Sequence, residues 1–327
     1  MPRQQGTSFA SSIGSGLVDS GLSVVVTGSG GWLGRVTLEM LAATLDRSFD
    51  SRVYAFGSRR SELTLPSGVG LTVRPLTDLP SLQIGPHLVA HYAFLTRDKV
   101  PELSLSDYLA TNEMIRELVA AHVQRSSVAG MFVPSSGAVY RGDRTLHTDL
   151  ASNPYGVLKR RDEERFLRLA ASGQIGRLVC ARVFNLAGPG INKREHYVLA
   201  SIIDEVIRGG PIRLRAARPV FRSYVHVVDL VDLSFAMMLG DGPLPTEPFD
   251  TAGEREVEIG DLASEAAALL GAPDMEVLRP SLQSLIPDRY VGDGEVMAAL
   301  AASGGIALRG LETQIVDTAD YLRASER

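Results

Sequence analysis

Short apolar runs without charge alternate with longer segments of helical spacing through the first half of the chain. The first run, residues 22–26, is β-branched and suits a strand buried on both faces of a parallel sheet. The longer segments carry apolar residues three and four positions apart, as one buried helix face requires. The pattern predicts strands at 22–26, 53–56, 71–73, 87–92, 131–133 and 178–183, and helices at 33–45, 106–122 and 154–171. This alternation predicts an α/β fold with a doubly wound (Rossmann) parallel sheet.

The pattern loosens after about residue 186, where Gly and Pro interrupt it repeatedly. Helices are predicted in this part at 197–208, 229–239, 259–270 and 310–324. We therefore expect a Rossmann domain over 21–186, with a return segment near 222–239. A smaller C-terminal α/β domain is expected over 187–327.

Composition excludes several classes of function. The 327-residue chain has a net charge of −5 and a pI near 5.7, and so lacks the basic character of a general nucleic-acid or anionic-membrane binder. It contains no run of about 18 apolar residues, so no membrane span is expected. Residues 1–20, rich in Gly and Ser, contain no apolar signal segment and are expected to form a flexible tail. These features together indicate a cytoplasmic protein.

No metal site is expected. Cys180 is the only cysteine and lies in an apolar run, which is typical of a buried core residue. The six histidines show no ligand-like spacing.

A glycine-rich turn follows the first predicted strand. Gly28, Gly31 and Gly34 permit a tight turn and a close approach of backbone N–H groups to a pyrophosphate, and the backbone at Trp32 and Leu33 opens the next helix. A helix N-terminus supplies unpaired donors and partial positive charge. The turn therefore predicts a dinucleotide site, the alternative being a tight turn that binds no ligand.

The end of the second strand predicts which dinucleotide binds. An acidic residue there would bind the free 2′-hydroxyl of NAD, but the segment carries Gly57, Ser58, Arg59 and Arg60 instead. Guanidinium groups pair with phosphate, so we favour NADP, with NAD as the other possibility. Alternatively, the two arginines are solvated loop charges.

Tyr155 and Lys159 carry the predicted chemistry. Asn153 is a good N-cap and Pro154 a good first helical residue, so Tyr155 falls in the first turn and Lys159 lies one turn further on the same face. Lowering the tyrosine pKa from about 10 toward 7 takes roughly 4 kcal/mol of phenolate stabilisation, part of which a lysine ammonium supplies.

A serine supplies a third member of this group. Ser135 and Ser136 follow the strand at 131–133, at the carboxyl end of the sheet where ligands bind. A hydroxyl there can hydrogen-bond a substrate oxygen while a proton moves. The alternative, that a serine only shapes the turn, applies more to Ser135 than to Ser136.

These motifs together identify a family. Over residues 22 to 300 the chain resembles the extended short-chain dehydrogenase/reductases, in particular the NAD(P)-dependent sugar-nucleotide epimerase/dehydratase group. The resemblance rests on Thr27 to Gly34, Val89 to Phe94, Asn112, Ser135 to Tyr140, Tyr155 with Lys159, Arg182 to Pro189 and Arg222 to Asp229.

The resemblance implies roles for single residues. It makes Ser136, Tyr155 and Lys159 catalytic, with Ser136 also touching the substrate. It places the cofactor against Ala93, Phe94, Asn112 and Val183, and the substrate's nucleotide diphosphate against Asn185 and Arg222; for Arg222 the alternative is a surface ion pair. Three departures stand out: Gly57 replaces a ribose-binding Asp, Pro75 an Asp near the adenine, and Phe94 a smaller alanine beside the nicotinamide.

The resemblance also narrows the reaction. Family dehydratases and decarboxylases carry an acid after the catalytic serine, whereas Gly137 and Ala138 stand there in this chain. We therefore expect an epimerase that transiently oxidises one carbon, C4, of a nucleotide-activated sugar. The alternatives are an NADPH-dependent ketoreductase and, less favoured, a non-catalytic dinucleotide sensor. Relatives also imply a homodimer formed through the helices near 106–122 and 154–171.

Overall fold

The computed structural model describes residues 7–325 of the chain, which form two compact units. Unit 1 comprises residues up to 182 together with 231–249, and unit 2 comprises 183–230 together with 250 onward. The chain thus leaves unit 1 and returns to it at 231–249. The return predicted from the sequence was at 222–239.

An eight-stranded sheet organises unit 1, in the order β12-β7-β6-β5-β1-β2-β4-β3. The pairs β1–β2, β1–β5, β2–β4 and β5–β6 are parallel, and β3 and β4 form an antiparallel hairpin that the sequence did not predict. The predicted doubly wound α/β sheet is confirmed. Its strands are β1 (Ser23–Thr27), β2 (Val53–Gly57), β3 (Ser61–Thr64), β4 (Gly70–Pro75), β5 (His87–His91), β6 (Val128–Ser136), β7 (Ile175–Val183) and β12 (Phe249–Asp250).

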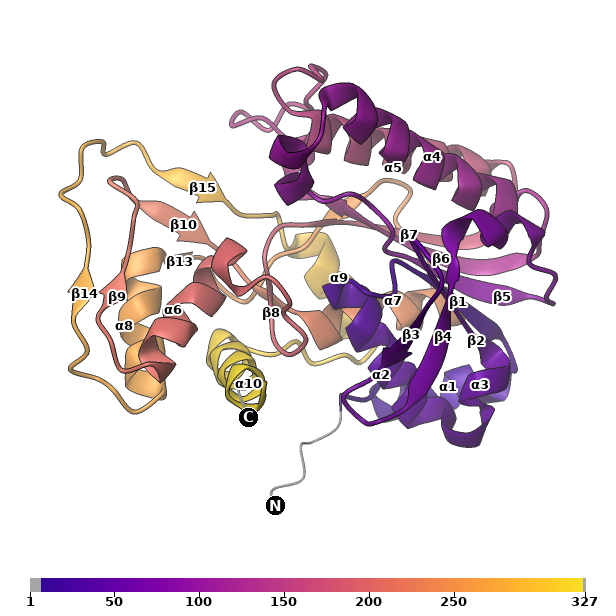
Figure 1. Ribbon diagram of the computed structural model, residues 1–327, viewed down its shortest axis with the longest axis horizontal. Helices are drawn as coiled ribbons and strands as arrows, with labels where there is room; N and C mark the ends of the chain where they lie inside the picture. Colours follow the sequence, from indigo (N-terminus) through magenta and orange to yellow (C-terminus); the bar gives the residue numbers. More distant parts are fainter. Residues whose placement is uncertain (1–6, 326–327) are drawn as a thin grey trace. The chain divides into compact units, whose positions relative to one another are not determined.

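Helices flank this sheet, with α4 and α5 together on one side (Figure 1). Val25, Val89 and Met131 from three strands are fully buried in one core with Val119 of α4 and Phe166 of α5. The uncharged runs of the sequence therefore form strands with apolar side chains inside, as a parallel sheet requires. The helices are α1 (Ser11–Ser20), α2 (Trp32–Leu45), α3 (Phe49–Arg52), α4 (Leu105–Val123), α5 (Pro154–Ala171) and α7 (Val227–Leu239).

Two buried histidines join the sheet to α4. His87 of β5 and His122 of α4 are at most 1% exposed, and their Nε2 atoms lie 2.9 Å apart. Burial lowers the pKa of both residues, and the neighbouring His87 contributes to lowering that of His122 to about 4. This histidine pair is therefore held neutral, with one ring donating a hydrogen bond to the other.

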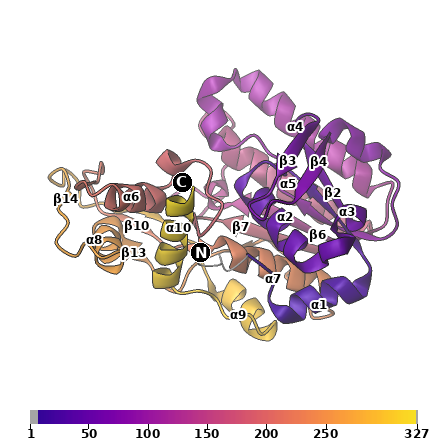
Figure 2. The same ribbon diagram turned by 60° about the horizontal axis from the view of Figure 1, so that its bottom comes forward.

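The expected flexible tail is wrong for residues 11–20, which form α1; residues 1–6 lie outside the described part of the chain. Phe9, Ile13 and Leu17 are buried and spaced four apart, and the Phe9 ring lies 4.7 Å from that of Phe235 in α7. Figure 2 shows α1 beside α7. Arg52 closes the other end of α1 by donating to the Leu17 carbonyl at 2.7 Å. The Gly- and Ser-rich composition of residues 1–20 suggested flexibility. The residues that pack against α1 come from elsewhere in the chain, so the composition of this segment did not reveal the helix.

Unit 2 contains short strands with several helices. β10 pairs with β13 and β15, β8 with β11, and β9 with β14. α6 contacts α8 and α10, which also contact each other. Its elements are β8 (Leu186–Ala187), α6 (Val198–Ile207), β9 (Ile212–Arg213), β10 (Val220–Arg222), β11 (Val225–His226), β13 (Val257–Glu258), α8 (Ile259–Leu269), β14 (Val277–Leu278), β15 (Asp288–Tyr290), α9 (Glu295–Ser303) and α10 (Leu311–Ala324).

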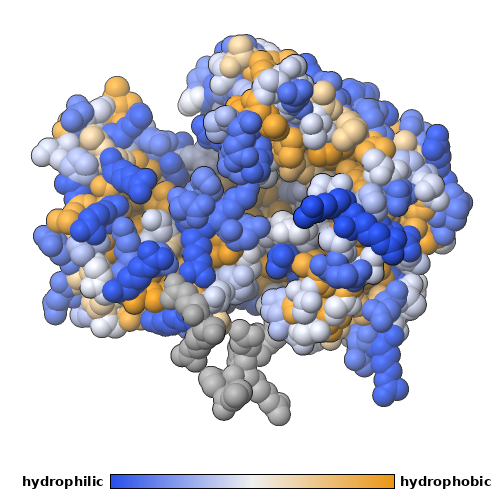
Figure 3. All heavy atoms as spheres, viewed as in Figure 1, coloured by the Kyte–Doolittle hydropathy of each residue, from blue (hydrophilic) through white to orange (hydrophobic). Residues whose placement is uncertain are grey.

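The surface is mixed in character. Hydrophilic residues cover much of the face in Figure 3, with hydrophobic residues interspersed. Within residues 7–325, no helix is both long and apolar enough to cross a membrane.

Candidate active site

The glycine turn lies where the strand order of the sheet reverses. β1 lies between β5 and β2, so the loops after β1 and β5 diverge at the position where doubly wound sheets bind ligands. The two loops touch: Thr27 Oγ1 accepts a hydrogen bond from Ala93 N at 3.2 Å. Gly28 has a φ of 68°, and a Cβ there would lie 2.6 Å from Ala93 N. Only glycine suits this position.

The same turn brings the start of α2 close to β1. A Cβ on Gly34 would overlap the Gly28 carbonyl oxygen, so the close approach depends on glycine here too. Gly31 is the N-cap residue and adds no side chain. Helix geometry leaves the N–H groups of Leu33 and Gly34 without intrahelical partners, with the partial positive charge of the helix start. The tight turn expected from the sequence is present, and its binding of a pyrophosphate stays a prediction.

The predicted ribose contact lies at the end of β2. Gly57 pairs with Pro75 of β4, so both departures from the family pattern lie side by side. Ser58, Arg59 and Arg60 follow and are exposed. In the described part of the chain neither guanidinium forms a hydrogen bond or ion pair, so both charges are available to an anionic ligand.

Asn112 anchors the segment after β5. Its Oδ1 accepts a hydrogen bond from Leu95 N at 2.8 Å, and its Nδ2 donates to the Tyr108 carbonyl at 3.2 Å. The Tyr108 hydroxyl donates to the Leu95 carbonyl at 2.8 Å, so α4 holds Leu95 through both backbone groups. These bonds give buried Asn112 a positioning role next to Ala93 and Phe94. Its direct contact with a cofactor stays a prediction.

The start of α5 is fixed against the loop after β6. Asn153 caps the helix by accepting from Gly156 N at 2.9 Å, and its Nδ2 donates to the Ala138 carbonyl at 2.8 Å. A Cβ on Gly156 would overlap the same carbonyl oxygen. The predicted cap is confirmed, and it places Tyr155 beside the loop that carries Ser136.

Ser136, Tyr155 and Lys159 come together in unit 1. Burial raises the pKa of Tyr155 above its ordinary value, and a hydrogen bond with Ser136 partly offsets this. Burial lowers the pKa of Lys159, and the charge of nearby Asp162 opposes that effect. The protein alone therefore keeps the proton on Tyr155, and further positive charge is needed before the phenol becomes a base.

A hydrogen-bond network around the carboxylate of Glu163 lies next to these residues and was not predicted from the sequence. Glu163 accepts a 2.5 Å hydrogen bond from Ser135 Oγ and two from Arg182, at 2.8 and 2.7 Å. Arg182 also donates to the Tyr140 hydroxyl at 2.5 Å. Ser135 is thus bound inward, whereas Ser136 reaches Tyr155. The available signal was helical spacing, since Glu163 lies one turn beyond Lys159 on the same face.

Asp162 is a second buried acid near Lys159. Burial raises the pKa of its carboxyl to about 7, and the charges of Lys159 and Arg116 counteract part of that rise. Arg116 Nη1 lies 3.7 Å from Asp162 Oδ1, an ion-pair distance too long for a hydrogen bond.

Unit 2 brings together the two predicted substrate residues. Asn185 donates to the carbonyls of Ser223 at 3.0 Å and Tyr290 at 3.2 Å. Arg222 Nη2 lies 3.2 Å from Asp288 Oδ2, so the ion pair considered for Arg222 forms. Val183, the predicted nicotinamide neighbour, ends β7 and belongs to unit 2.

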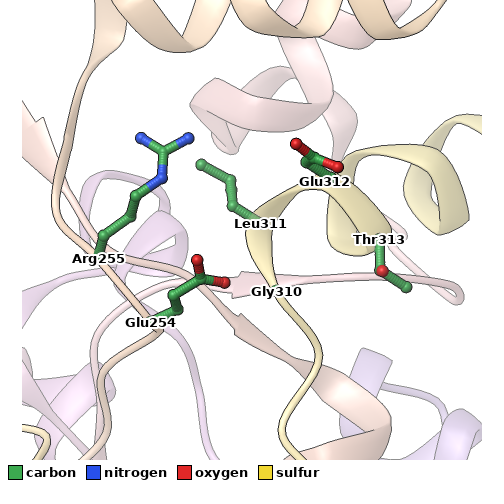
Figure 4. A pocket seen from close by; sticks show the side chains of 6 residues that line it. All are labelled: Glu254, Arg255, Gly310, Leu311, Glu312 and Thr313. Atoms are coloured by element: carbon green, nitrogen blue, oxygen red, sulfur yellow. The ribbon is translucent and has the colours of Figure 1, made fainter.

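A pocket of about 340 Å³ at the start of α10 is a different feature (Figure 4). Its one guanidinium, Arg255, is bound by both carboxylate oxygens of Glu265 at 2.5 Å. None of the predicted site residues line it, so we do not place the chemistry there. It is lined by Glu254, Arg255, Gly310, Leu311, Glu312 and Thr313. Within residues 7–325, no cluster of three or more His, Cys, Asp or Glu is arranged to hold a metal ion.

Sequence comparison adds a family match. Residues 24–245 match the model of the NAD dependent epimerase/dehydratase family. UDP-glucuronic acid decarboxylase 6 of Arabidopsis thaliana is 27% identical over 159 residues, which are 46% of this chain and 45% of that protein. The match thus spans less than half the length of that relative.

Solved structures share the fold. A UDP-N-acetylglucosamine 4-epimerase from Methanobrevibacter ruminantium M1, in complex with UDP-N-acetylmuramic acid, superimposes with a TM-score of 0.71 at 17% identity, covering 93% of this chain and 99% of that one. MoeE5 in complex with UDP-glucose and NAD gives a TM-score of 0.66 at 23% identity, covering 93% and 100%. At these identities the likeness shows a shared fold.

Proposed function

The chain belongs to the NAD-dependent epimerase/dehydratase family, and we propose that it is an NAD(P)-dependent epimerase of a nucleotide-activated sugar. The observation that carries the proposal is the position of Tyr155. Its hydroxyl is hydrogen-bonded to Ser136, and Lys159 lies one helical turn further along α5. UDP-sugars bound by structures of the same fold support this substrate class. Gly137 and Ala138 place no carboxylate directly after Ser136, which disfavours dehydration and decarboxylation.

The chain's residues fit a dinucleotide. Gly28 and Gly34 allow the tight turn, because a Cβ at either position would overlap neighbouring backbone, and the start of α2 supplies N–H donors for the pyrophosphate. Arg59 and Arg60 would hold a 2′-phosphate. When bound, the nicotinamide supplies reversible acceptance of a hydride from the substrate carbon.

The residues of unit 1 handle the proton. Tyr155 as phenolate accepts the proton of the sugar hydroxyl at C4 while the carbon is oxidised, and returns it when the carbon is reduced on the opposite face. Ser136 donates a hydrogen bond to the reacting oxygen. Lys159 supplies positive charge that would stabilise the phenolate, in addition to the hydrogen bond with Ser136 that opposes the effect of burial on the Tyr155 pKa.

A turnover assay tests the proposal. Purified protein is incubated with UDP-, GDP- and dTDP-sugars, with and without NADPH, while reduced nicotinamide absorbance and sugar stereochemistry are followed. Inversion at C4 without net consumption of NADPH is the expected result. Cofactor binding without turnover across the panel would instead indicate a dinucleotide sensor. Tyr155→Phe should abolish turnover and keep cofactor binding; near wild-type turnover in that variant contradicts the acid/base assignment.

The exposed arginines favour a second candidate, an NADPH-dependent ketoreductase of a keto-sugar nucleotide. Arg59 and Arg60 are free to pair with a 2′-phosphate, and NADPH is the common reducing cofactor. Stoichiometric loss of NADPH in the same assay would support this reaction. Replacing both arginines by alanine should weaken NADP much more than NAD, and equal weakening would refute the 2′-phosphate contact.

We also propose a homodimer formed through α4 and α5. These helices pack together, and cross-helix ion pairs, such as Arg161 with Glu113 at 2.8 Å, order their outer side chains. Sedimentation should give twice the mass of one chain, whereas a monomer at micromolar concentration would contradict this arrangement.

A further inference from the structure

Phe94 occupies a distinctive place beside the two predicted catalytic side chains. Lys159 Nζ lies 4.0 Å from the centre of the Phe94 ring, and the Tyr155 ring lies at 86° to that ring with centroids 5.6 Å apart. One aromatic ring thus contacts both members of the pair.

The ammonium of Lys159 is held from two directions. It donates a 2.9 Å hydrogen bond to the Pro134 carbonyl and places its charge against the Phe94 ring. A cation on an aromatic face out of bulk water gains about a factor of 5 to 30 in equilibrium terms. Lys159 is 8% exposed, so the contact lies at the desolvated end of this range.

The ring itself is fixed by its neighbour. Leu95, the next residue, is bonded through N to Asn112 and through its carbonyl to Tyr108. The backbone beside Phe94 is therefore anchored to α4, and this anchoring fixes the position of the ring.

We propose that Phe94 is a positioning residue that clamps the Lys159 ammonium next to Tyr155. The proposal rests on the proposed function, because it assigns the contact a purpose in the proton transfer to and from Tyr155. A small side chain at this position would remove the aromatic face and leave the Lys159 ammonium its hydrogen bond to the Pro134 carbonyl.

Two substitutions separate the aromatic face from mere bulk. Phe94→Tyr keeps the ring, whereas Phe94→Leu keeps an apolar side chain and removes the face that attracts the cation. We expect Phe94→Leu to lower kcat by about 5- to 30-fold with little change in KM, and Phe94→Tyr to lower kcat less than Phe94→Leu does. Equal kcat in the Leu variant and wild type, or equal losses in both variants, would overturn the clamp. Circular dichroism checks that each variant is folded.

A chemical measurement tests the clamp without turnover. The sequence contains three lysines, so Lys99 and Lys193 are internal references for Lys159. Labelling of the three amines by trinitrobenzenesulfonate at fixed pH is followed by peptide mass spectrometry. Phe94→Leu should accelerate labelling of Lys159 relative to half-buried Lys99, and Phe94→Tyr should not. Unchanged relative labelling in the Leu variant refutes the contact. If wild type converts no nucleotide sugar but the labelling result holds, the proposed function fails and the clamp does not.

Discussion

Replacing Glu163 by glutamine should destabilise the protein strongly. The Glu163 side chain is 3% exposed and that of Arg182 12%, and two short hydrogen bonds join them. Burial by itself would lower the pKa of Arg182, but hydrogen bonds and charge from Glu163 and Tyr140 raise it above the ordinary value. The substitution leaves this guanidinium charged, buried and without a counter-ion. Breaking such a buried pair costs about 3–5 kcal/mol.

The neighbouring residue provides a matched control. Glu164 forms an ion pair with Arg160 at 2.9 Å, but its side chain is 45% exposed, and helical pairs of this kind contribute about 0.3–0.5 kcal/mol. Glu163→Gln and Glu164→Gln make the same chemical change at adjacent positions of α5. They differ in burial and in the partner that is left behind.

Urea unfolding followed by circular dichroism measures both effects as free energies of unfolding. We expect a loss of about 3–5 kcal/mol for Glu163→Gln and a small one for Glu164→Gln. Glu163→Leu combined with Arg182→Met should lose less than Glu163→Gln alone, because no unpaired charge stays buried. Equal losses at positions 163 and 164 would refute the argument from burial.

Three further predictions follow from the described contacts. Gly156→Ala adds a methyl group against the Ala138 carbonyl and should lower kcat about 100-fold by displacing the start of α5. Gly142→Ala is the control, because a methyl group there meets open space. Wild-type kcat in the Gly156 variant would contradict the close packing of α5 on the Ala138 carbonyl. The histidine pair is neutral when folded, so its stabilisation is complete above pH 6.5 and is lost as pH falls toward about 4. Between pH 6.5 and 4, urea unfolding should show that His122→Gln loses about 3 kcal/mol less unfolding free energy than wild type does. If both proteins lose the same unfolding free energy over this range, the assignment is refuted. Phe9→Ala should cost about 3–5 kcal/mol of unfolding free energy, against little for exposed Val18→Ala, and a loss no larger than that of Val18→Ala would mean that α1 is not docked.

Features set by neighbouring residues were predictable from the sequence. Gly28 and Gly34 were recognised because a strand, a tight turn and a helix follow one another within a few residues. Asn153 and Pro154 marked the start of α5, and i+4 spacing placed Tyr155 and Lys159 on one face. In each case the physical cause lies within one helical turn, so periodicity and capping preferences reveal it.

Features that depend on distant partners were not predictable in this way. Glu163 and Arg182 are 19 positions apart and meet only because β7 lies beside β6 in the sheet. The sequence favoured Ser136 over Ser135 as the reactive serine, but it did not reveal the partner of Ser135, because Glu163 lies 28 positions away. Helix α1 looked like a tail because the Phe235 ring that covers Phe9 comes much later in the chain.

The late return of the chain to unit 1 has a consequence for biosynthesis. Ala10 N donates to Asp232 Oδ1 at 3.1 Å, a bond between residues 222 positions apart. At about 5–20 residues per second, a ribosome needs about 10–45 s to make the segment between them. During that interval α2 can already contact α1, but Phe9 lacks the Phe235 ring of α7 that covers it. A nascent chain stalled before α7 should therefore recruit chaperones, and one stalled after residue 249 has emerged should release them.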